Sequence, residues 1–427
     1  MRILLQGAQV FQNNRFQVQD ILINQQYIEQ MGPHLTAPDA QILAMNNLVI
    51  APGFVDVHVH LREPGFNAKE TIKTGTLAGA HGGYTTVAAM PNVQPSIDTP
   101  RRLQAQIARN QASAQVHVLQ YANITKDRTS EQLVDFAALK AAGAFGFSND
   151  GNGVQSAQTM YQAMLAAKQA NLPIMAHIED DSLANHGVMN AGLRAQELGL
   201  PGIEPVAETA QLARDLELAA ASGVHYHACH VSTAASVELI RVAKKRGINV
   251  SAEVTPHHLL LDESMITTDN PQLKMNPPLR TLQDRQACLA GLLDGTIDMI
   301  ATDHAPHTVN DKAGSMLTAA FGITGLETSF VMLYERLVKP QLCSLAQLIN
   351  WLSVKPAQVF NLTAAGQLRV GQVADLVVLN LHQPHTITAD SMLSCGQNSP
   401  FIGQQVEAEV AATMVAGRWA YRKEQTE

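Results

Sequence analysis

Cysteine is scarce in this sequence, and its spacing suggests no pairing. The chain of 427 residues has four cysteines, far apart and without a C-x-x-C pair: Cys229, Cys288, Cys343 and Cys395. This pattern excludes both a disulfide framework and a thiolate zinc site. We therefore expect four free thiols in a reducing cytosol.

Long apolar runs and an excess of basic charge are also missing. The apolar start at Met1 reaches Gln6 at once, which is too short for a signal peptide, and no later run approaches membrane-spanning length. We expect a cytoplasmic protein without a membrane partner. The formal net charge is -8 and the Lys and Arg residues are scattered, so no nucleic-acid partner is expected. Any anionic small molecule must then be held by a local cation.

The residues that are present suit a compact globular protein. Hydrophobic residues make up 46% of the chain and charged residues 15%. The length fits one large α/β barrel or about two to three ordinary domains. A substantial buried core is therefore expected.

A repeated pattern extends from residue 53 to residue 304. Short apolar, β-branched runs end in polar residues and alternate with Ala-rich stretches of helical period. Alternating strands and helices require parallel pairing, and eight units without an obvious edge strand predict a closed (β/α)8 barrel of TIM type. A doubly wound open sheet is the alternative. The eight expected strands cover residues 53–60, 85–92, 116–123, 144–150, 172–178, 224–231, 248–255 and 297–304.

The two ends of the chain have a different pattern. Residues 1–51 alternate apolar and polar residues in short pieces with turn signals between them, and residues 367–427 do the same. We infer that both ends pair into one small β-sandwich domain, which lies beside a barrel domain formed by residues 52–366.

Polar residues collect at the expected ends of the strands, where barrel enzymes carry their catalytic groups. His58 and His60 are spaced by two and share one face of the first strand. Four imidazoles and two carboxylates suit zinc, with manganese, cobalt or iron as alternatives. Six ligands are too many for one tetrahedral ion with an open position, so two ions are predicted. The six candidates are His58, His60, Asp150, His177, His230 and Asp303.

Each candidate also has a structural interpretation. A lone histidine in a strand is more often a buried core residue, and we assign His225 and His227 to that class. Asp303 alone would serve equally well as a helix cap. The joint occurrence of the six residues at strand ends favours metal binding. Asp56 shares the inward parity of His58 but lies deeper, and we expect it to orient a metal ligand.

Several longer motifs match a known family. The most specific are PGFVDVHVHLREPG at residues 52–65 and KMNPPLR at 274–280; the others are GYTT at 83–86, MPN at 90–92, AHIED at 176–180, CHVST at 229–233, AEVTPHH at 252–258 and IATDHAPH at 300–307. By these motifs the chain resembles the type I (bacterial) dihydroorotases of the amidohydrolase superfamily over essentially its whole length. The resemblance implies a zinc-dependent cyclic amide hydrolase of pyrimidine (UMP) biosynthesis.

The resemblance also implies two zinc ions per subunit. It assigns the first ion to His58, His60 and Asp303. It assigns the second ion to His177 and His230, and it makes Asp150 the bridge between the two ions. Many superfamily members bridge the metals with a carboxylated lysine, but no Lys stands at the end of the fourth strand. The family usually has two consecutive acidic residues there. The first of them is Asn149 in this chain, which leaves the metal affinity at one position open.

A reaction and a set of substrate contacts follow from the same resemblance. N-carbamoyl-L-aspartate would cyclise reversibly to L-dihydroorotate with loss of water, through a metal-bridging hydroxide and with Asp303 as general acid and base. Arg62 suits the substrate carboxylate because a guanidinium donates two parallel hydrogen bonds; a structural pairing with Glu63 or Asp303 is the alternative. The implied substrate contacts are His60, Arg62, Asn92, Asn276 and His307, with the backbone around Phe321 and Gly322.

Residues 304–317 contain few apolar anchors and many turn-forming residues. Because His307 lies within them, we interpret them as a mobile loop that closes over the substrate and excludes water. A plain surface connection is the alternative.

Two other functions remain open on the sequence. A hydantoinase, dihydropyrimidinase or allantoinase would share the barrel, metals and chemistry, although Arg62, Asn92 and Asn276 favour an acidic substrate. A non-catalytic, dihydroorotase-like scaffold subunit is the second alternative, but such chains typically lose metal ligands, and none is lost here. The resemblance further implies a homodimer and allows an association with aspartate carbamoyltransferase.

Overall fold

Eight short parallel strands follow one another along the chain and close into a barrel. The structure is a computed structural model and describes residues 2–423. The barrel strands are β6 (Phe54–Val59), β7 (Tyr84–Ala89), β8 (His117–Gln120), β9 (Phe147–Ser148), β10 (Ile174–Ala176), β13 (Tyr226–Ala228), β14 (Val250–Val254) and β15 (Met299–Ile300). Each lies within, or within one residue of, an expected range.

The closure of the barrel rests on two isolated parallel bridges. β6, β7 and β8 form one run of paired strands, and β9, β10, β13, β14 and β15 form another. Ala122 pairs with Phe147 and Val59 pairs with His304, which joins the two runs at both ends. The predicted closed barrel is therefore confirmed, and the open doubly wound sheet is excluded.

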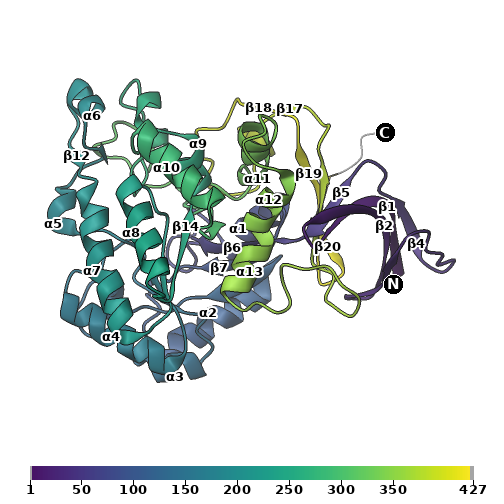
Figure 1. Cartoon of the computed structure of the whole chain (residues 1–427), viewed down its shortest axis with the longest axis horizontal. Helices are drawn as coiled ribbons and strands as arrows, with labels where there is room; N and C mark the ends of the chain where they lie inside the picture. Colours follow the sequence, from purple (N-terminus) through teal and green to yellow (C-terminus); the bar gives the residue numbers. More distant parts are fainter. Residues whose placement is uncertain (1, 424–427) are drawn as a thin grey trace.

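Helices cover the outside of the barrel strands (Figure 1). Their starts follow from capping side chains, because the first N–H groups of a helix need acceptors. The Thr71 side chain accepts from Thr74 N–H at the start of α1, and the Thr233 side chain accepts from Ser236 N–H at the start of α8. The longer helices are α1 (Ile72–His81), α2 (Pro100–Ser113), α4 (Ala157–Ala170), α7 (Val206–Ser222), α8 (Ala234–Lys245) and α10 (Leu282–Leu293).

Shorter elements complete the barrel and its loops. The short α-helices are α3 (Phe136–Ala141), α5 (Asp181–Ala184), α6 (Leu193–Leu198), α9 (Pro256–Leu260), α11 (Ser329–Leu333), α12 (Leu345–Ile349) and α13 (Lys355–Val359). Two π-helical turns, η4 (Tyr334–Val338) and η5 (Asn350–Val354), continue α11 and α12. The 3-10 turns are η1 (Lys126–Arg128), η2 (Glu263–Met265), η3 (Pro271–Leu273) and η6 (Ala389–Ser391). Two small strand pairs are β11 (Met189–Asn190) with β12 (Gly202–Ile203), and β17 (His385–Thr386) with β18 (Gln405–Val406).

Both ends of the chain pair into one sheet beside the barrel, so that purple and yellow strands lie side by side in Figure 1. Its order is β20-β19-β16-β5-β1-β2-β3, with β4 beside β1. β5 and β16 join the two ends, and Ala51 pairs with Val377. The domain boundaries at 1–51, 52–366 and 367–427 stay a prediction. The strands are β1 (Arg2–Gln12), β2 (Arg15–Asn24), β3 (Tyr27–Gly32), β4 (Gln41–Ala44), β5 (Val49–Pro52), β16 (Leu376–Asn380), β19 (Glu409–Val415) and β20 (Arg418–Arg422).

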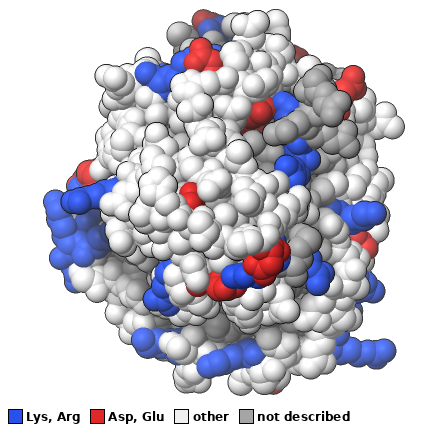
Figure 2. Space-filling view, turned by 90° about the vertical axis from the view of Figure 1, so that its right-hand side faces the viewer, with Lys and Arg blue, Asp and Glu red and all other residues white. Residues whose placement is uncertain are grey.

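The charged surface and the cysteines can be compared with the scattered basic residues and the four free thiols expected from the sequence. The face seen in Figure 2 is largely neutral, with separate groups of Lys and Arg toward its edges and some Asp and Glu among them. Within residues 2–423, no helix has both the length and the apolarity needed to cross a membrane. All four cysteines are free, and three of them are buried: Cys229, Cys288 and Cys343.

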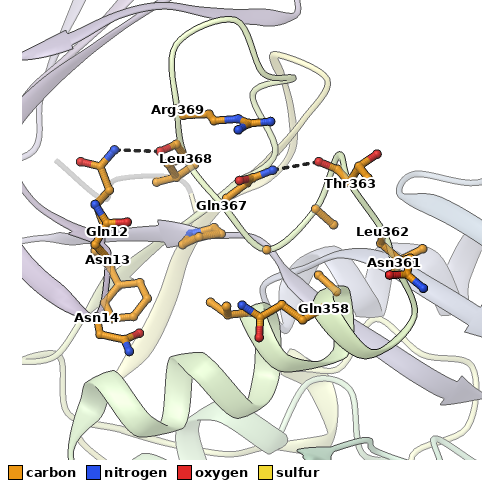
Figure 3. A pocket seen from close by; sticks show the side chains of 16 residues that line it. Gln12, Asn13, Asn14, Gln358, Asn361, Leu362, Thr363, Gln367, Leu368 and Arg369 are labelled. Atoms are coloured by element: carbon orange, nitrogen blue, oxygen red, sulfur yellow. Dashed lines mark hydrogen bonds between the residues drawn. The ribbon is translucent and has the colours of Figure 1, made fainter.

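A cavity of about 870 Å³ lies where the terminal sheet meets the barrel (Figure 3). Its labelled side chains are mostly amides, and Gln12 Nε2 donates to Leu368 O across 3.0 Å. Pro52, which also lines it, lies just before β6. The cavity therefore faces the amino ends of the barrel strands, opposite to the end at which barrel enzymes carry their catalytic groups.

Candidate active site

The six candidate metal ligands meet at the carboxyl ends of the barrel strands. All six are buried. His230 and Asp303 have positive φ angles of 34° and 47°, which residues other than glycine rarely adopt and which cluster at functional sites. The strand ends supply them as expected: His58 and His60 from β6 and the residue after it, Asp150 after β9, His177 after β10, His230 after β13 and Asp303 after β15.

Two carboxylates face the histidine pair of β6. His60 Nε2 lies 2.8 Å from Asp303 Oδ1, and His58 Nε2 lies 3.4 Å from the same oxygen. Asp150 is nearly as close, with Oδ1 3.3 Å from His58 Nε2 and Oδ2 3.4 Å from His60 Nε2. The ligand atoms therefore converge on a common volume.

Asp150 also reaches the second pair of histidines. Its Oδ1 lies 3.6 Å from His177 Nδ1 and 3.7 Å from His230 Nε2. These two ring nitrogens are themselves 3.0 Å apart. Among residues 2–423, Asp150 is the one carboxylate within 4 Å of all four histidines, the arrangement expected of a bridging ligand.

The donor set of the cluster fits a metal ion. His58 Nε2 and Asp150 Oδ1 are buried, yet neither has a hydrogen-bond partner among residues 2–423. Orphaned buried polar atoms are costly, and a shared cation would satisfy both. His58, His60 and Asp303 offer ligand atoms that all lie within 4.8 Å of one another, and so do His58, Asp150 and His230. Imidazole and carboxylate ligands of this kind suit zinc and similar ions.

Glu253 of β14 fixes the orientation of the His58 ring. Its Oε1 lies 2.6 Å from His58 Nδ1, and its Oε2 lies 3.0 Å from His227 Nε2. Burial by itself would raise the pKa of Glu253, but the charge of His58 and the hydrogen bonds with His227 and His58 lower it below its ordinary value. An ionised Glu253 accepts the Nδ1 proton, which leaves His58 Nε2 free for a metal.

Asp56 connects the histidine strand to the segment before Asp303. Its Oδ1 accepts the His58 backbone N–H at 3.0 Å, and its Oδ2 accepts the Thr302 hydroxyl at 2.5 Å. Burial raises the pKa of Asp56 to about 7. Asp56 therefore positions the backbone beside two candidate ligands, whereas Glu253 contacts the imidazole ring of His58 itself.

Asn149 is bonded to a neighbouring loop. Its Oδ1 accepts from Ile124 N–H at 3.0 Å and from Thr125 N–H at 3.2 Å, and its Nδ2 donates to Thr125 Oγ1 at 2.7 Å. The amide therefore holds the segment after β8. The acidic candidate ligand at the end of β9 is Asp150, whereas the Asn149 side chain bonds only the loop at Ile124 and Thr125.

Five of the six candidate ligands, all except His58, line a cavity of about 200 Å³. Residues that are up to about 260 positions apart in the sequence meet in it, because they follow several different barrel strands. The cavity is lined by all of the expected substrate contacts: His60, Arg62, Asn92, Asn276, His307, Phe321 and Gly322.

Arg62 brings a half-buried positive charge to this cavity. Its Nε donates to Pro306 O at 3.3 Å. Burial lowers the pKa of Arg62 to about 10, although Asp303 and Asp150 oppose the shift, so the guanidinium is charged at neutral pH. Within residues 2–423, Arg62 forms no ion pair with Glu63 or Asp303, which excludes the structural pairing considered above.

His307 is a neutral imidazole whose two closest polar neighbours are Phe321 O and Lys69 Nζ, with Arg62 Nη2 farther away, 3.4 Å from its Nε2. Burial, and then the charge of Arg62, lower its pKa to about 3. Its Nε2 lies 2.8 Å from Phe321 O, and its Nδ1 lies 3.3 Å from Lys69 Nζ. The partners assign the proton to Nε2, because a carbonyl can only accept and an ammonium can only donate.

The side-chain amides of Asn92 and Asn276, which both line the cavity, have different hydrogen-bond partners. Asn92 Oδ1 lies 2.9 Å from His60 Nδ1, so this amide orients a candidate metal ligand. Asn276 Nδ2 donates to Glu179 Oε2 at 2.7 Å, while Asn276 Oδ1 is buried without a partner among the described residues. Asn276 therefore lines the cavity and keeps one acceptor unpaired.

Gly322 fits its position because no side chain would. Its φ is 135°, and a Cβ there would lie 2.7 Å from Ala305 Cβ. Its N–H donates to Lys274 O at 3.0 Å, and its carbonyl accepts from Lys312 Nζ at 2.9 Å and from Asn398 Nδ2 at 3.0 Å. The backbone polar groups of Gly322 are therefore already bonded within the protein.

The segment 304–317 is more firmly anchored than its composition indicates. Lys312 is buried and its Nζ donates to three carbonyls, those of Lys274, Ala320 and Gly322. Met316 is fully buried. No helix begins at Asp303, so the helix-cap interpretation is wrong.

Glu253 and Lys69 were not among the residues expected at the site. A signal existed for Glu253, since a carboxylate between Ala252 and Val254 in a buried strand must have a partner. Lys69 lies four residues after the LREPG motif and carried no comparable signal. The assignment of His227 to the core agrees with its bonds to Ser251 and Glu253.

Solved structures of similar fold include a hydantoinase and a dihydropyrimidinase. The chain matches the L-hydantoinase (dihydropyrimidinase) from Arthrobacter aurescens with a TM-score of 0.90 at 23% identity, covering 100% of this chain and 97% of that one. It matches the dihydropyrimidinase from Brevibacillus agri with a TM-score of 0.88 at 21% identity, covering 99% and 95%. At this level of identity the likeness concerns the fold alone, the (β/α)8 barrel with its terminal sheet.

Sequence relatives are far closer. A family model described as Dihydro-orotase-like matches residues 47–236. The dihydroorotase of Pediococcus pentosaceus is 58% identical over 424 residues, which is 99% of this chain and 100% of that protein. The dihydroorotase of Lactiplantibacillus plantarum is 59% identical over 427 residues, covering 99% of both. The chain therefore belongs to the dihydroorotase family.

Proposed function

We propose that the protein is a metal-dependent dihydroorotase, which interconverts N-carbamoyl-L-aspartate and L-dihydroorotate in pyrimidine biosynthesis. The observation that carries the proposal is the cavity of about 200 Å³, which is lined by five of the six candidate metal ligands and by the half-buried Arg62. Whole-length relatives at 50% to 59% identity that are named dihydroorotase support it.

Zinc is the proposed metal, with two ions per subunit. When bound, it would lower the pKa of a coordinated water toward about 7 and polarise the amide carbonyl. Asn92 and Glu253 would orient His60 and His58 through the ring nitrogens that face away from the cluster. The first ion would be held by His58, His60 and Asp303. The second would be held by His177 and His230, and Asp150 would bridge the two.

Arg62 and Asn276 account for the choice of an acidic substrate. The desolvated guanidinium of Arg62 would bind the carboxylate, and burial strengthens such a pair relative to one in water. The unpaired Asn276 Oδ1 would accept from an N–H of the substrate. His307 and the Phe321–Gly322 backbone would then close the opposite wall by shape.

Asp303 is the proposed proton carrier. Its Oδ1 lies 2.8 Å from His60 Nε2, inside the cluster and at the wall of the cavity. In the hydrolytic direction it would accept the proton of the attacking water and deliver it to the leaving ring nitrogen; in the cyclising direction the same carboxyl group would reverse both transfers.

Three further assignments belong to the proposal. The partner is a small molecule, the assembly is a homodimer, and an association with aspartate carbamoyltransferase is allowed by the family. The rival activities, hydantoinase and dihydropyrimidinase, have support from the fold neighbours only, at 20% to 23% identity. The scaffold alternative is disfavoured, because all six candidate ligands are present and converge.

Removal and return of the metal test the proposal. The purified protein, dialysed against a chelator, should lose dihydroorotate hydrolysis and regain it with Zn²⁺. Full activity in metal-free protein would contradict the metal dependence. A metal-loaded protein without activity on dihydroorotate would contradict the substrate.

A further inference from the structure

A short stretch of the C-terminal region, residues 394–399, packs against the wall of the cavity. It lies between η6 and β18 and contains neither helix nor strand. Ser394, Asn398 and Ser399 are nevertheless at most 5% exposed. A loop that is buried in this way must bond its polar groups within the protein.

Asn398 uses its whole side chain to bond the backbone of the cavity wall. Its Oδ1 accepts from His307 N–H at 2.8 Å, and its Nδ2 donates to Ala305 O and to Gly322 O, both at 3.0 Å. Its own backbone carbonyl accepts from Thr324 N–H at 3.1 Å. These bonds reach two separate segments, one on either side of the turn through residues 308–321.

A close backbone approach at Gly396 supports the same contact independently. A Cβ at Gly396 would lie 2.6 Å from Pro306 Cβ and 2.7 Å from His307 N, which no side chain tolerates without movement. Gly396 and Asn398 therefore meet the segment 305–307 along its backbone. Arg62 Nε donates to the carbonyl of Pro306 in that segment, so the contact extends to the cation of the cavity.

We propose that Asn398 is a positioning residue for substrate binding, which fixes the His307 backbone and the Gly322 carbonyl at a set spacing across the cavity wall. It does not line the cavity itself; it acts through the two segments that do. A small misplacement of binding groups weakens binding out of proportion to the bond that is lost. The inference rests on the proposed dihydroorotase function, because its test measures binding of dihydroorotate.

Replacement of Asn398 by Ala tests the proposal through separate kinetic constants. Asn398→Ala should raise KM for dihydroorotate about tenfold or more, while kcat changes much less. Gly396→Ala keeps every hydrogen-bonding side chain but displaces residues 306–307, and it should raise KM in the same direction. A KM within about twofold of the unsubstituted protein in either folded variant would overturn the proposal.

A matched control separates positioning from plain stability. Asn190 is 1% exposed and bonds to Glu263 and Arg280, outside the cavity. Asn190→Ala should lower Tm as Asn398→Ala does, with KM unchanged. If both variants raise KM equally, the effect is a general loss of stability and the proposal fails.

Hydrogen exchange of the unsubstituted protein decides the case even if the Asn398 and Gly396 variants do not fold. The His307 amide should exchange as slowly as the barrel strands, since Asn398 Oδ1 accepts its proton. Fast exchange there would overturn the proposal. If the unsubstituted protein does not act on dihydroorotate, the proposed function fails instead, and the exchange result still stands on its own.

Discussion

Glu253 Oε1 lies 2.6 Å from His58 Nδ1, deep in the barrel. The carboxylate has no exposed surface, and its second oxygen is bonded to His227. This contact determines which nitrogen of His58 faces the other candidate ligands. The geometry of the cluster therefore depends on a residue that does not itself contact Asp150 or Asp303.

Loss of the Glu253 charge should weaken metal binding. Glu253→Gln keeps the volume but removes the strong acceptor of the Nδ1 proton, and we expect the affinity for Zn²⁺ to fall about 10-fold to 100-fold, as measured by competition with a chelator. Glu327→Gln is the matched control, since Glu327 Oε1 is also 2.6 Å from a histidine nitrogen, that of His81, away from the cavity. Equal metal affinities in Glu253→Gln and the unsubstituted protein would contradict the role of Glu253.

Asp303→Asn should lower turnover far more than it changes substrate affinity. An amide cannot carry a proton between water and the leaving nitrogen, so kcat should fall about 10²-fold to 10⁴-fold while KM changes little. Metal content is measured alongside, because Asp303 is also a candidate ligand. Asp215→Asn, at a buried carboxylate paired with Arg214, should affect stability only. Comparable losses in kcat and in affinity would speak against a proton carrier.

Arg62→Lys should impair binding of the acidic substrate. A lysine keeps the charge but loses the paired donors, and with hydrogen bonds to charged groups worth about 1.5 to 3 kcal/mol we expect KM for dihydroorotate to rise about 10-fold to 100-fold. Arg102→Lys, at a surface pair with Asp98, is the control. The interpretation of Arg62 is wrong if the rise is no larger than in the control.

One ion pair between the barrel and the terminal sheet should make stability depend on pH. His117 Nε2 of β8 lies 3.0 Å from Asp375 Oδ2, and this hydrogen bond raises the pKa of His117. A raised pKa in the folded state stabilises the protein fully below the unfolded value of about 6.5, and the stabilisation is lost as the pH rises through the folded value. His117→Gln should therefore lower Tm at about pH 5.5 and have little effect at about pH 9. An equal change in Tm at both pH values would contradict the coupling.

The barrel could be predicted from the sequence because one unit repeats along it: an apolar strand, the polar residues at its end, and then a helical stretch. The expected ranges contain or adjoin all eight strands, although β9 and β15 have only two residues each. These two strands are shorter than the apolar runs that predicted them, 144–150 and 297–304. The family was equally accessible, because whole motifs such as LREPG specify it, and the dihydroorotase relatives confirm it.

Contacts across long sequence separations were not predictable from local patterns. Asn149 could only be read as a missing acid, whereas it bonds the loop at Thr125. Asn398 looks like an ordinary loop residue, and its partners lie 76 to 93 positions away. The anchoring of Lys312 by three carbonyls is hidden in the same way, because backbone acceptors leave no trace in the sequence.

Metal content and substrate choice, measured on one preparation, test the central claim most directly. The purified protein is analysed for bound metal and assayed against dihydroorotate, hydantoin and allantoin. We expect about two zinc ions per subunit, hydrolysis of dihydroorotate, and little action on the other two rings, which lack the carboxylate that Arg62 would bind. Hydrolysis of hydantoin without action on dihydroorotate would contradict the account.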